Sequence, residues 1–426
     1  MIRKDFEKLG VHYFEERLPN GLLVRVMEKP GFAKRYAFVA ADYGSIDAAF
    51  VRDGKRYQTP QGVAHYLEHK MFDLPEGNAM QEFAKYAGAN NAFTSYTMTA
   101  YYVECTEHLE ENLEILLRMV TTGYFTQESV EKERGIIAQE IKMYDDSADS
   151  AVMENLFRIM YQNHPVKNAI AGTVESIQDI TAETLQLCHD TFYDPSNLIL
   201  CVIGDVDAAA VIDQARRQTP EGKKILVERE YGAPEPAQVK TRRIEKQMEI
   251  SMPAFAIGFR CPDAGRGASA MRTELIGELA GEILVGESSA LYQKLYDENI
   301  IDADFSVDYE RMKGMALLEL AGDSEQPERI LREVLQEAER VLQTGVDRAL
   351  LKRLKKSVTG RRLRELDGFE GTCYRMCAYY FDGAEYLDYP DAFSSVTAED
   401  VEQFIRENVK EEQAFLSVIT PKREEE

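Results

Sequence analysis

The sequence predicts an α+β fold made of two related halves. Stretches rich in β-branched and aromatic residues alternate with longer segments of helical periodicity along the chain. At 426 residues the chain is too long for one ordinary hydrophobic core. The sequence ITAE at 180–183 aligns with VTAE at 396–399, and the apolar strands at 198–203 and 414–419 then align without a gap. A helix–strand unit that recurs in this way indicates a duplication.

Composition argues against several classes of protein. The chain is 44% hydrophobic and 29% charged, as in soluble globular proteins. A formal charge of −24 argues against nucleic acid or a membrane surface as the main partner. The first ten residues lack the apolar segment of a signal peptide, and no run approaches the roughly 18 apolar residues of a membrane-spanning helix. The six scattered cysteines suggest buried free thiols, so we expect a cytoplasmic protein.

The first half opens with strands and continues into helices. Residues 14–29 predict two strands joined by a turn at Pro19–Gly21, because Asn-Gly between apolar runs is typical of a hairpin. A loop at 59–62 then leads into a helix with the sequence HYLEH. The other elements that we expect in this half are a strand within 33–50, a short helix at 79–89, a strand at 90–106, helices at 107–120 and 128–144, and a helix–strand unit at 176–207.

The remaining segments predict the domain boundaries. Residues 221–243 are rich in Glu, Lys, Pro and Gly, which is typical of a linker. We therefore expect an N-terminal domain at 1–220 and a C-terminal domain at 244–426. In the second half, the helix at 273–286 stands in the place of the HYLEH helix but has no histidine, so only the first half can carry a metal site. The basic helix at 346–366 is expected to have a solvated face rather than an acidic partner.

The HYLEH sequence, from His65 to His69, is the motif with the clearest chemistry. Residues i and i+4 lie one turn apart on one face of a helix, so His65 and His69 can direct both imidazoles at one ion. Glu68 lies on the same side and can activate water as a base, as in the inverted form of the zinc-peptidase motif. The alternative is two ordinary surface or core histidines. The helical wheel favours the metal site, since the apolar residues of this helix fall on the opposite side.

The helix at 128–144 carries two carboxylates that need an explanation. Glu133 and Glu140 are two turns apart and point the same way. Both fall within a sector of apolar residues, where a carboxylate is costly unless a cation or a donor compensates it. The histidine pair supplies such a partner for Glu140. The alternative is a buried arginine or a helix cap. The apolar residues of this sector are Val130, Ile136, Ile137, Ile141, Met143 and Tyr144.

Together these segments resemble the pitrilysin or insulinase type of zinc peptidases. HYLEH matches the H-x-x-E-H motif of that family, and EKERGIIAQE at 131–140 resembles the segment that brings the third ligand, at the usual spacing. NNAFTS at 90–95 and SSALYQKLYDE at 288–298 resemble two further family segments. The resemblance covers essentially the whole chain, whose length is that of short members such as the mitochondrial processing peptidase subunits. It implies two homologous halves, each a mostly antiparallel sheet covered by helices, that enclose a chamber.

The resemblance also implies roles for individual residues. His65, His69 and Glu140 would bind Zn²⁺, and Glu68 would take a proton from the attacking water. Glu133 would not bind the ion itself but would contact the residues that do. Asn91, Ala92 and Phe93 would lie on an edge strand that pairs with the main chain of the substrate. We therefore expect a zinc-dependent endopeptidase that hydrolyses extended peptides.

One departure from the family affects the expected assembly. Members with a complete site carry an Arg and, seven residues later, a Tyr that stabilise the substrate carbonyl. Here Tyr296 stands at the Arg position and no Tyr follows in place. This absence implies a homodimer or heterodimer with a related subunit that supplies the pair. Two alternatives stay open: a non-catalytic peptide-binding or assembly subunit, and a metalloenzyme that acts on something other than peptide.

Overall fold

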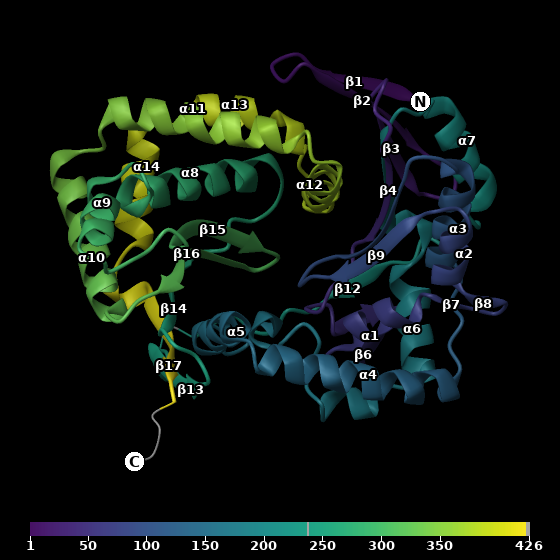
Figure 1. Cartoon of the computed structure of the whole chain (residues 1–426), viewed down its shortest axis with the longest axis horizontal. Coiled ribbons are helices and arrows are strands. Elements are labelled where there is room, and N and C mark those ends of the chain that lie inside the picture. The colour runs from purple at the N-terminus through teal and green to yellow at the C-terminus, as the bar shows by residue number, and fades with distance from the viewer. Residues whose placement is uncertain (237, 423–426) are drawn as a thin grey trace. The chain divides into compact units, whose positions relative to one another are not determined.

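The structure is a computed structural model that describes residues 1–236 and 238–422 (Figure 1). Helices and strands follow one another along the whole chain, which confirms the predicted α+β class. The described chain divides into two compact units. Unit 1 consists of residues 1–141, 169–231 and 363–382, and unit 2 consists of the other described residues.

Unit 1 contains a seven-stranded sheet with the order β1-β2-β3-β11-β4-β10-β9. β11 is buried along its whole length and pairs parallel with β3 and antiparallel with β4. Its continuous apolar sequence, LILCVIG, is typical of a strand covered on both faces. The strands are β1 (Ile2–Phe6), β2 (Val11–Arg17), β3 (Leu23–Glu28), β4 (Arg35–Ala41), β9 (Ala89–Thr94), β10 (Thr99–Cys105) and β11 (Leu198–Gly204). Two smaller sheets contain β5 (Ala49–Arg52), β6 (Lys55–Gln58) and β12 (Val227–Arg229), and β7 (Asp73–Leu74) and β8 (Gly77–Asn78).

The turn between β2 and β3 forms where the sequence predicts it. The two strands are antiparallel, with Phe14 opposite Val26. Gly21 has a φ of 97°, a conformation that favours glycine. A Cβ atom at this position would also lie 2.6 Å from Cβ of Ser196, so glycine is required here by the backbone and by the space.

Helices of unit 1 pack on the sheet and on one another. The apolar side of α3 is buried, as its periodicity predicts, and α3 contacts β10, β4 and α7. The helices are α1 (Val63–Lys70), α2 (Ala79–Lys85), α3 (Leu109–Thr121), α4 (Gln127–Asp145), α6 (Ala182–Phe192) and α7 (Ala208–Gln218). Short 3₁₀ turns occur in both units: Ser176–Asp179 and Pro195–Asn197 in unit 1, and Pro165–Lys167, Tyr386–Asp388 and Glu411–Gln413 in unit 2.

Unit 2 contains a five-stranded sheet with the order β13-β17-β14-β16-β15. β17 pairs parallel with β13 and antiparallel with β14, as β11 does with β3 and β4. The helices before β11 and β17 also begin alike, with Thr181 and Thr397 as N-caps, which confirms the two homologous halves. The strands are β13 (Arg243–Met248), β14 (Ala254–Cys261), β15 (Ser306–Met312), β16 (Met315–Asp323) and β17 (Ala414–Pro421). The helices are α8 (Gly267–Val285), α9 (Ala290–Asp297), α10 (Pro327–Thr344), α11 (Arg348–Glu365), α13 (Tyr389–Ser395) and α14 (Ala398–Asn408).

Each unit takes one helix from the other half of the sequence. α5 (Ala148–Met160) packs on β14 and β17 of unit 2, where Gly258 makes room for Met160. α12 (Phe369–Phe381) packs on β11 and β4 of unit 1, and Sγ of Cys377 lies 3.5 Å from Sγ of Cys201. The compact units and the predicted domains at 1–220 and 244–426 therefore share most of their residues and differ at these two helices.

Neither a disulfide nor a membrane-spanning helix is found among the described residues. All six cysteines are buried and free, as we expect from their spacing. No helix in the described part of the chain is long and apolar enough to cross a bilayer.

Carboxylates gather on neighbouring strands of unit 2. Asp308 on β15 lies opposite Glu319 on β16, and Glu310 lies two residues along from Asp308. Oε2 of Glu319 is buried, and no described residue forms a hydrogen bond with it. Burial, followed by the charges of Glu310 and Asp308, raises the pKa of Glu319 to about 8.

This raised pKa predicts that Glu319→Gln stabilises the protein in alkaline solution. The unfolded chain releases this proton near the ordinary value of 4.5, and the folded chain releases it near 8, so stability falls as the pH rises between these values. We expect the variant to equal wild type near pH 4.5 and to exceed it by about 1–3 kcal/mol at pH 8.5, measured by denaturant unfolding. The matched change at the exposed Glu325 should have no such pH dependence.

The glycine before α1 gives a second prediction. Gly62 has a φ of 86°, and a Cβ atom there would lie 2.3 Å from the carbonyl oxygen of Ala171. Gly62→Ala should lower the free energy of unfolding by about 1–3 kcal/mol more than Gly54→Ala does. Gly54 has a similar φ of 75° but open space around it. Equal losses in the two variants would show that the contact with Ala171 is unimportant.

Candidate metal centre

Helix α1 carries three of the residues that the sequence singles out: His65, Glu68 and His69. It begins directly after Gly62. The side of the helix opposite the motif is buried, as the wheel predicts. The motif side is covered as well, by β9 and α4, which leaves His65 and Glu68 only 7% and 8% exposed. The apolar residues on the buried side are Val63, Ala64, Leu67 and Met71.

The structure brings His65, His69 and Glu140 together. Nε2 of His65 lies 3.5 Å from Oε1 of Glu140, and Nε2 of His69 lies 3.2 Å from Oε2 of the same carboxylate. One ligand atom from each residue falls within 4.8 Å of the others. Among the described residues, these three form the one such group of histidines and carboxylates that could hold a metal ion.

This group fits a zinc ion. Histidine nitrogen and carboxylate oxygen are both common zinc ligands, and in a tetrahedral site their distances of about 2.0–2.2 Å from the ion put neighbouring ligand atoms about 3.3 Å apart. Each imidazole lies at about this distance from one of the two oxygens of Glu140. Three protein ligands also leave one coordination position for water, as in catalytic zinc sites.

Helix α4 supplies the carboxylates, but only part of its apolar sector is packed. Val130, Ile137 and Ile141 are buried as expected, whereas Ile136 and Met143 are 54% and 60% exposed. Tyr144, at the end of the helix, is 40% exposed. The expectation that one continuous apolar face surrounds Glu140 is therefore wrong. Glu140 lies at the border between the packed and the exposed part, where its side chain is 23% exposed.

Glu68 lies on the same side of α1 as the two histidines and contacts strand β9. Its side chain accepts a hydrogen bond on Oε2 from the hydroxyl of Thr94, at 2.8 Å, in strand β9. Burial raises the pKa of Glu68 above its ordinary value, although the histidines and Thr94 oppose this effect. A carboxylate with a raised pKa takes up a proton more readily than an ordinary glutamate does.

Glu133 contacts the Nδ1 side of the His69 ring. Its Oε1 is 3.2 Å from Nδ1 of His69, so the imidazole can donate there while Nε2 faces Glu140. This hydrogen bond lowers the pKa of Glu133, against the effect of burial. A carboxylate in this position fixes the tautomer and the orientation of a metal-binding histidine.

The strand β9, which contains Asn91, Ala92 and Phe93, is the outermost strand of its sheet. The main-chain N–H of Ala92 donates to the side-chain oxygen of Asn91, at 2.9 Å. Ala92 lies opposite Tyr101 of β10. The ring of Phe93 packs between Phe38 and Tyr374. The N–H of Ala92 is therefore covered by a side chain of its own strand.

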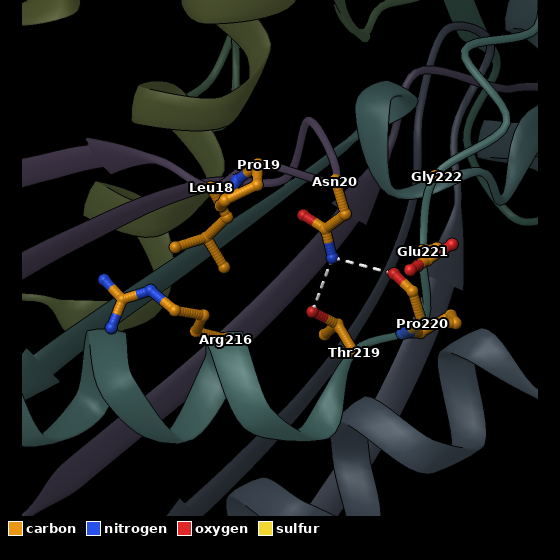
Figure 2. Close-up of a pocket in the computed structure, with 8 residues that line it drawn as sticks. All are labelled: Leu18, Pro19, Asn20, Arg216, Thr219, Pro220, Glu221 and Gly222. Carbon is orange, nitrogen blue, oxygen red and sulfur yellow. Dashed lines mark hydrogen bonds between the residues drawn. The ribbon is translucent and has the colours of Figure 1, made fainter.

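A cavity elsewhere in unit 1 contains none of these residues. It has a volume of about 370 Å³ and lies between the β2–β3 turn and the end of α7 (Figure 2). Asn20 donates to Thr219 and to the carbonyl oxygen of Pro220 at its wall, and Arg216 pairs with Glu16. The cavity is not part of the candidate centre. The residues that line it are Leu18, Pro19, Asn20, Arg216, Thr219, Pro220, Glu221 and Gly222.

Two family descriptions match this chain. Residues 45–174 match "Insulinase (Peptidase family M16)", which includes every residue of the candidate centre. Residues 179–358 match "Peptidase M16 inactive domain". The second match begins within the first half, after the candidate centre, and continues into the second half, which lacks a histidine motif.

Similar proteins are known over the full length of the chain. The uncharacterized zinc protease YmfH of Bacillus subtilis is 35% identical, over 98% of this chain and 99% of that protein. The zinc protease PqqE of Helicobacter pylori is 24% identical over 86% of each chain. The crystal structure of an M16-like peptidase from Alicyclobacillus acidocaldarius superposes with a TM-score of 0.92 at 33% identity and covers 96% of this chain and 98% of that one.

The two histidines of α1 face Glu140 of α4, and this arrangement predicts the effect of removing that carboxylate. We expect the purified protein to bind one zinc ion and Glu140→Gln to weaken this binding by at least about 100-fold, since loss of a direct ligand should exceed the 10–100-fold loss seen for outer partners. Metal analysis and chelator competition measure both. Glu131→Gln, the same change on the exposed side of α4, should bind zinc as wild type does. Unchanged affinity in Glu140→Gln would remove Glu140 from the site.

Proposed function

The chain belongs to the insulinase family of peptidases, peptidase family M16, and we propose that it is a zinc-dependent endopeptidase that hydrolyses extended peptides. The convergence of His65, His69 and Glu140, with Glu68 on the same helix, is the observation that carries this proposal. Relatives named as zinc proteases support it.

Zinc held by these three residues would polarise the substrate carbonyl and make the attacking water more acidic. Glu68 accepts the proton of this water and later returns it to the nitrogen of the leaving amine. The hydroxyl of Thr94 occupies Oε2 of Glu68, so we assign the transfer to Oε1. Glu133 holds His69 in the tautomer in which Nε2 is free to bind the metal.

The substrate would bind as an additional strand along β9. Its main chain would pair with Ala92, once the side chain of Asn91 moves away from the N–H that it now covers. Thr94 connects this edge strand with Glu68, so the base would lie near a peptide bound there. Main-chain pairing provides affinity with little dependence on sequence, so extended segments of many sequences are suitable substrates.

We further propose that the chain is the zinc-bearing subunit of a two-subunit peptidase. The residue aligned with the expected arginine is Tyr296, which is 47% exposed and stacks on Tyr292. Without donors for the developing oxyanion, activity falls by roughly 10²–10³. A related partner subunit would supply these donors.

The sharpest test is Glu68→Gln, which removes the base but keeps the shape of the side chain. We expect the variant to keep its zinc and to lose peptide cleavage by about 10²–10⁴-fold, because proton transfer contributes this much. Cleavage of an unstructured peptide should be measured for both proteins, alone and with the related subunit from the same source.

Glu131→Gln should retain wild-type cleavage in the same assay. Equal rates for wild type and Glu68→Gln would overturn the mechanism. A zinc-loaded wild type that binds peptide but cleaves none, with or without the partner, would favour a non-catalytic peptide-binding subunit.

A further inference from the structure

Lys70, which directly follows the second histidine, is buried to an unusual degree. Its side chain is 3% exposed. An ammonium group is costly to bury unless carboxylates pair with it. Two do so here: Oδ2 of Asp73 lies 2.5 Å from Nζ, and Oε2 of Glu133 lies 3.4 Å from it.

Asp73 is itself fixed by neighbouring side chains. Its Oδ2 also accepts a hydrogen bond from the hydroxyl of Ser129 at 2.5 Å, and its Oδ1 accepts one from the amide of Asn78 at 3.4 Å. Ser129 lies on α4, and Asp73 begins the short strand β7. The ammonium group of Lys70 is therefore held on one side by a carboxylate with a defined orientation.

On its other side, Lys70 reaches the carboxylate that supports the metal ligands. Glu133 uses Oε2 for Lys70 and Oε1 for Nδ1 of His69. A carboxylate with one oxygen attached to a fixed ammonium group has little freedom to rotate away from the imidazole. Asp73, Lys70, Glu133 and His69 thus form one continuous chain of contacts that ends at the candidate metal centre.

We infer that Lys70 is a positioning residue of the metal centre: held by Asp73, it orients Glu133, and Glu133 orients His69. This inference rests on the proposed zinc site. Lys70 touches neither the ion nor the substrate. It also provides positive charge beside Glu133, where it favours the ionised carboxylate.

The test is the zinc affinity of Lys70→Met, which keeps the length of the side chain and removes its charge. Loss of an outer partner of a metal-binding histidine costs 10–100-fold in affinity, and we expect about 10-fold because Lys70 acts through Glu133. Affinity is measured on the full-length protein by competition with a chromogenic zinc chelator. An unchanged affinity would overturn the inference.

A double variant separates positioning from stability. Lys70→Met leaves Asp73 without its cation and should lower the melting temperature. Lys70→Met combined with Asp73→Asn removes both charges and should recover much of this loss, while zinc affinity stays about 10-fold below wild type. Recovery of zinc affinity together with melting temperature would show that Lys70 has only a structural role.

A double-mutant cycle tests the route through Glu133. If Lys70 acts on the ion only through this carboxylate, Lys70→Met should change zinc affinity by less than about 2-fold in a Glu133→Gln background. A full 10-fold effect there would overturn the route.

Arg229→Met is the matched control, since Arg229 is a partly buried cation that pairs with Asp42 and Asp47 away from the centre. It should lose stability but keep its zinc affinity. An equal loss of zinc affinity in this control would overturn the specific role of Lys70. A wild-type protein without a tight zinc site would instead overturn the proposed function itself.

Discussion

The candidate centre depends on the packing of α1 against α4. α1 supplies two imidazoles and one carboxylate, and α4 supplies two carboxylates, so neither helix can form the site alone. Buried apolar residues on both helices hold them together, and the hydroxyl of Tyr66 donates to the main-chain oxygen of Val130 across the contact. These contacts bring the ionisable groups within reach of one another, which would be unfavourable without a cation between them.

The duplication explains why the two halves have different tasks. Both sheets contain an interior strand that is parallel to one neighbour and antiparallel to the other. Only α1 has a histidine pair, whereas α8, its counterpart by position in the sequence, has no histidine and packs on β15. A helix from the other half of the sequence packs on each sheet: α12 on the sheet of unit 1 and α5 on the sheet of unit 2. The two halves therefore depend on each other for their cores although only one carries the chemistry.

Patterns of local origin could be predicted from the sequence, and contacts between distant segments could not. The spacing of His65 and His69, the strand pair around Gly21 and the repeated helix–strand unit follow from helix and strand geometry. A helical wheel shows which residues share a side of a helix but not which part of that side other elements cover. It therefore does not predict that Ile136 and Met143 are exposed. The pairing of Lys70 with Asp73 and Glu133 also depends on tertiary contacts that no spacing in the sequence indicates.

Three glutamates of the centre show how neighbours decide the role of a side chain. Glu140 faces two imidazoles and is suited to bind a cation with them. Glu68 is buried beside the imidazoles and accepts a hydrogen bond from the neutral hydroxyl of Thr94, so its carboxylate can still take up a proton. Glu133 lies between an imidazole and an ammonium group, both of which favour its ionised form. The same chemical group is thus suited to be a ligand, a base or a support according to the partners that the fold places around it.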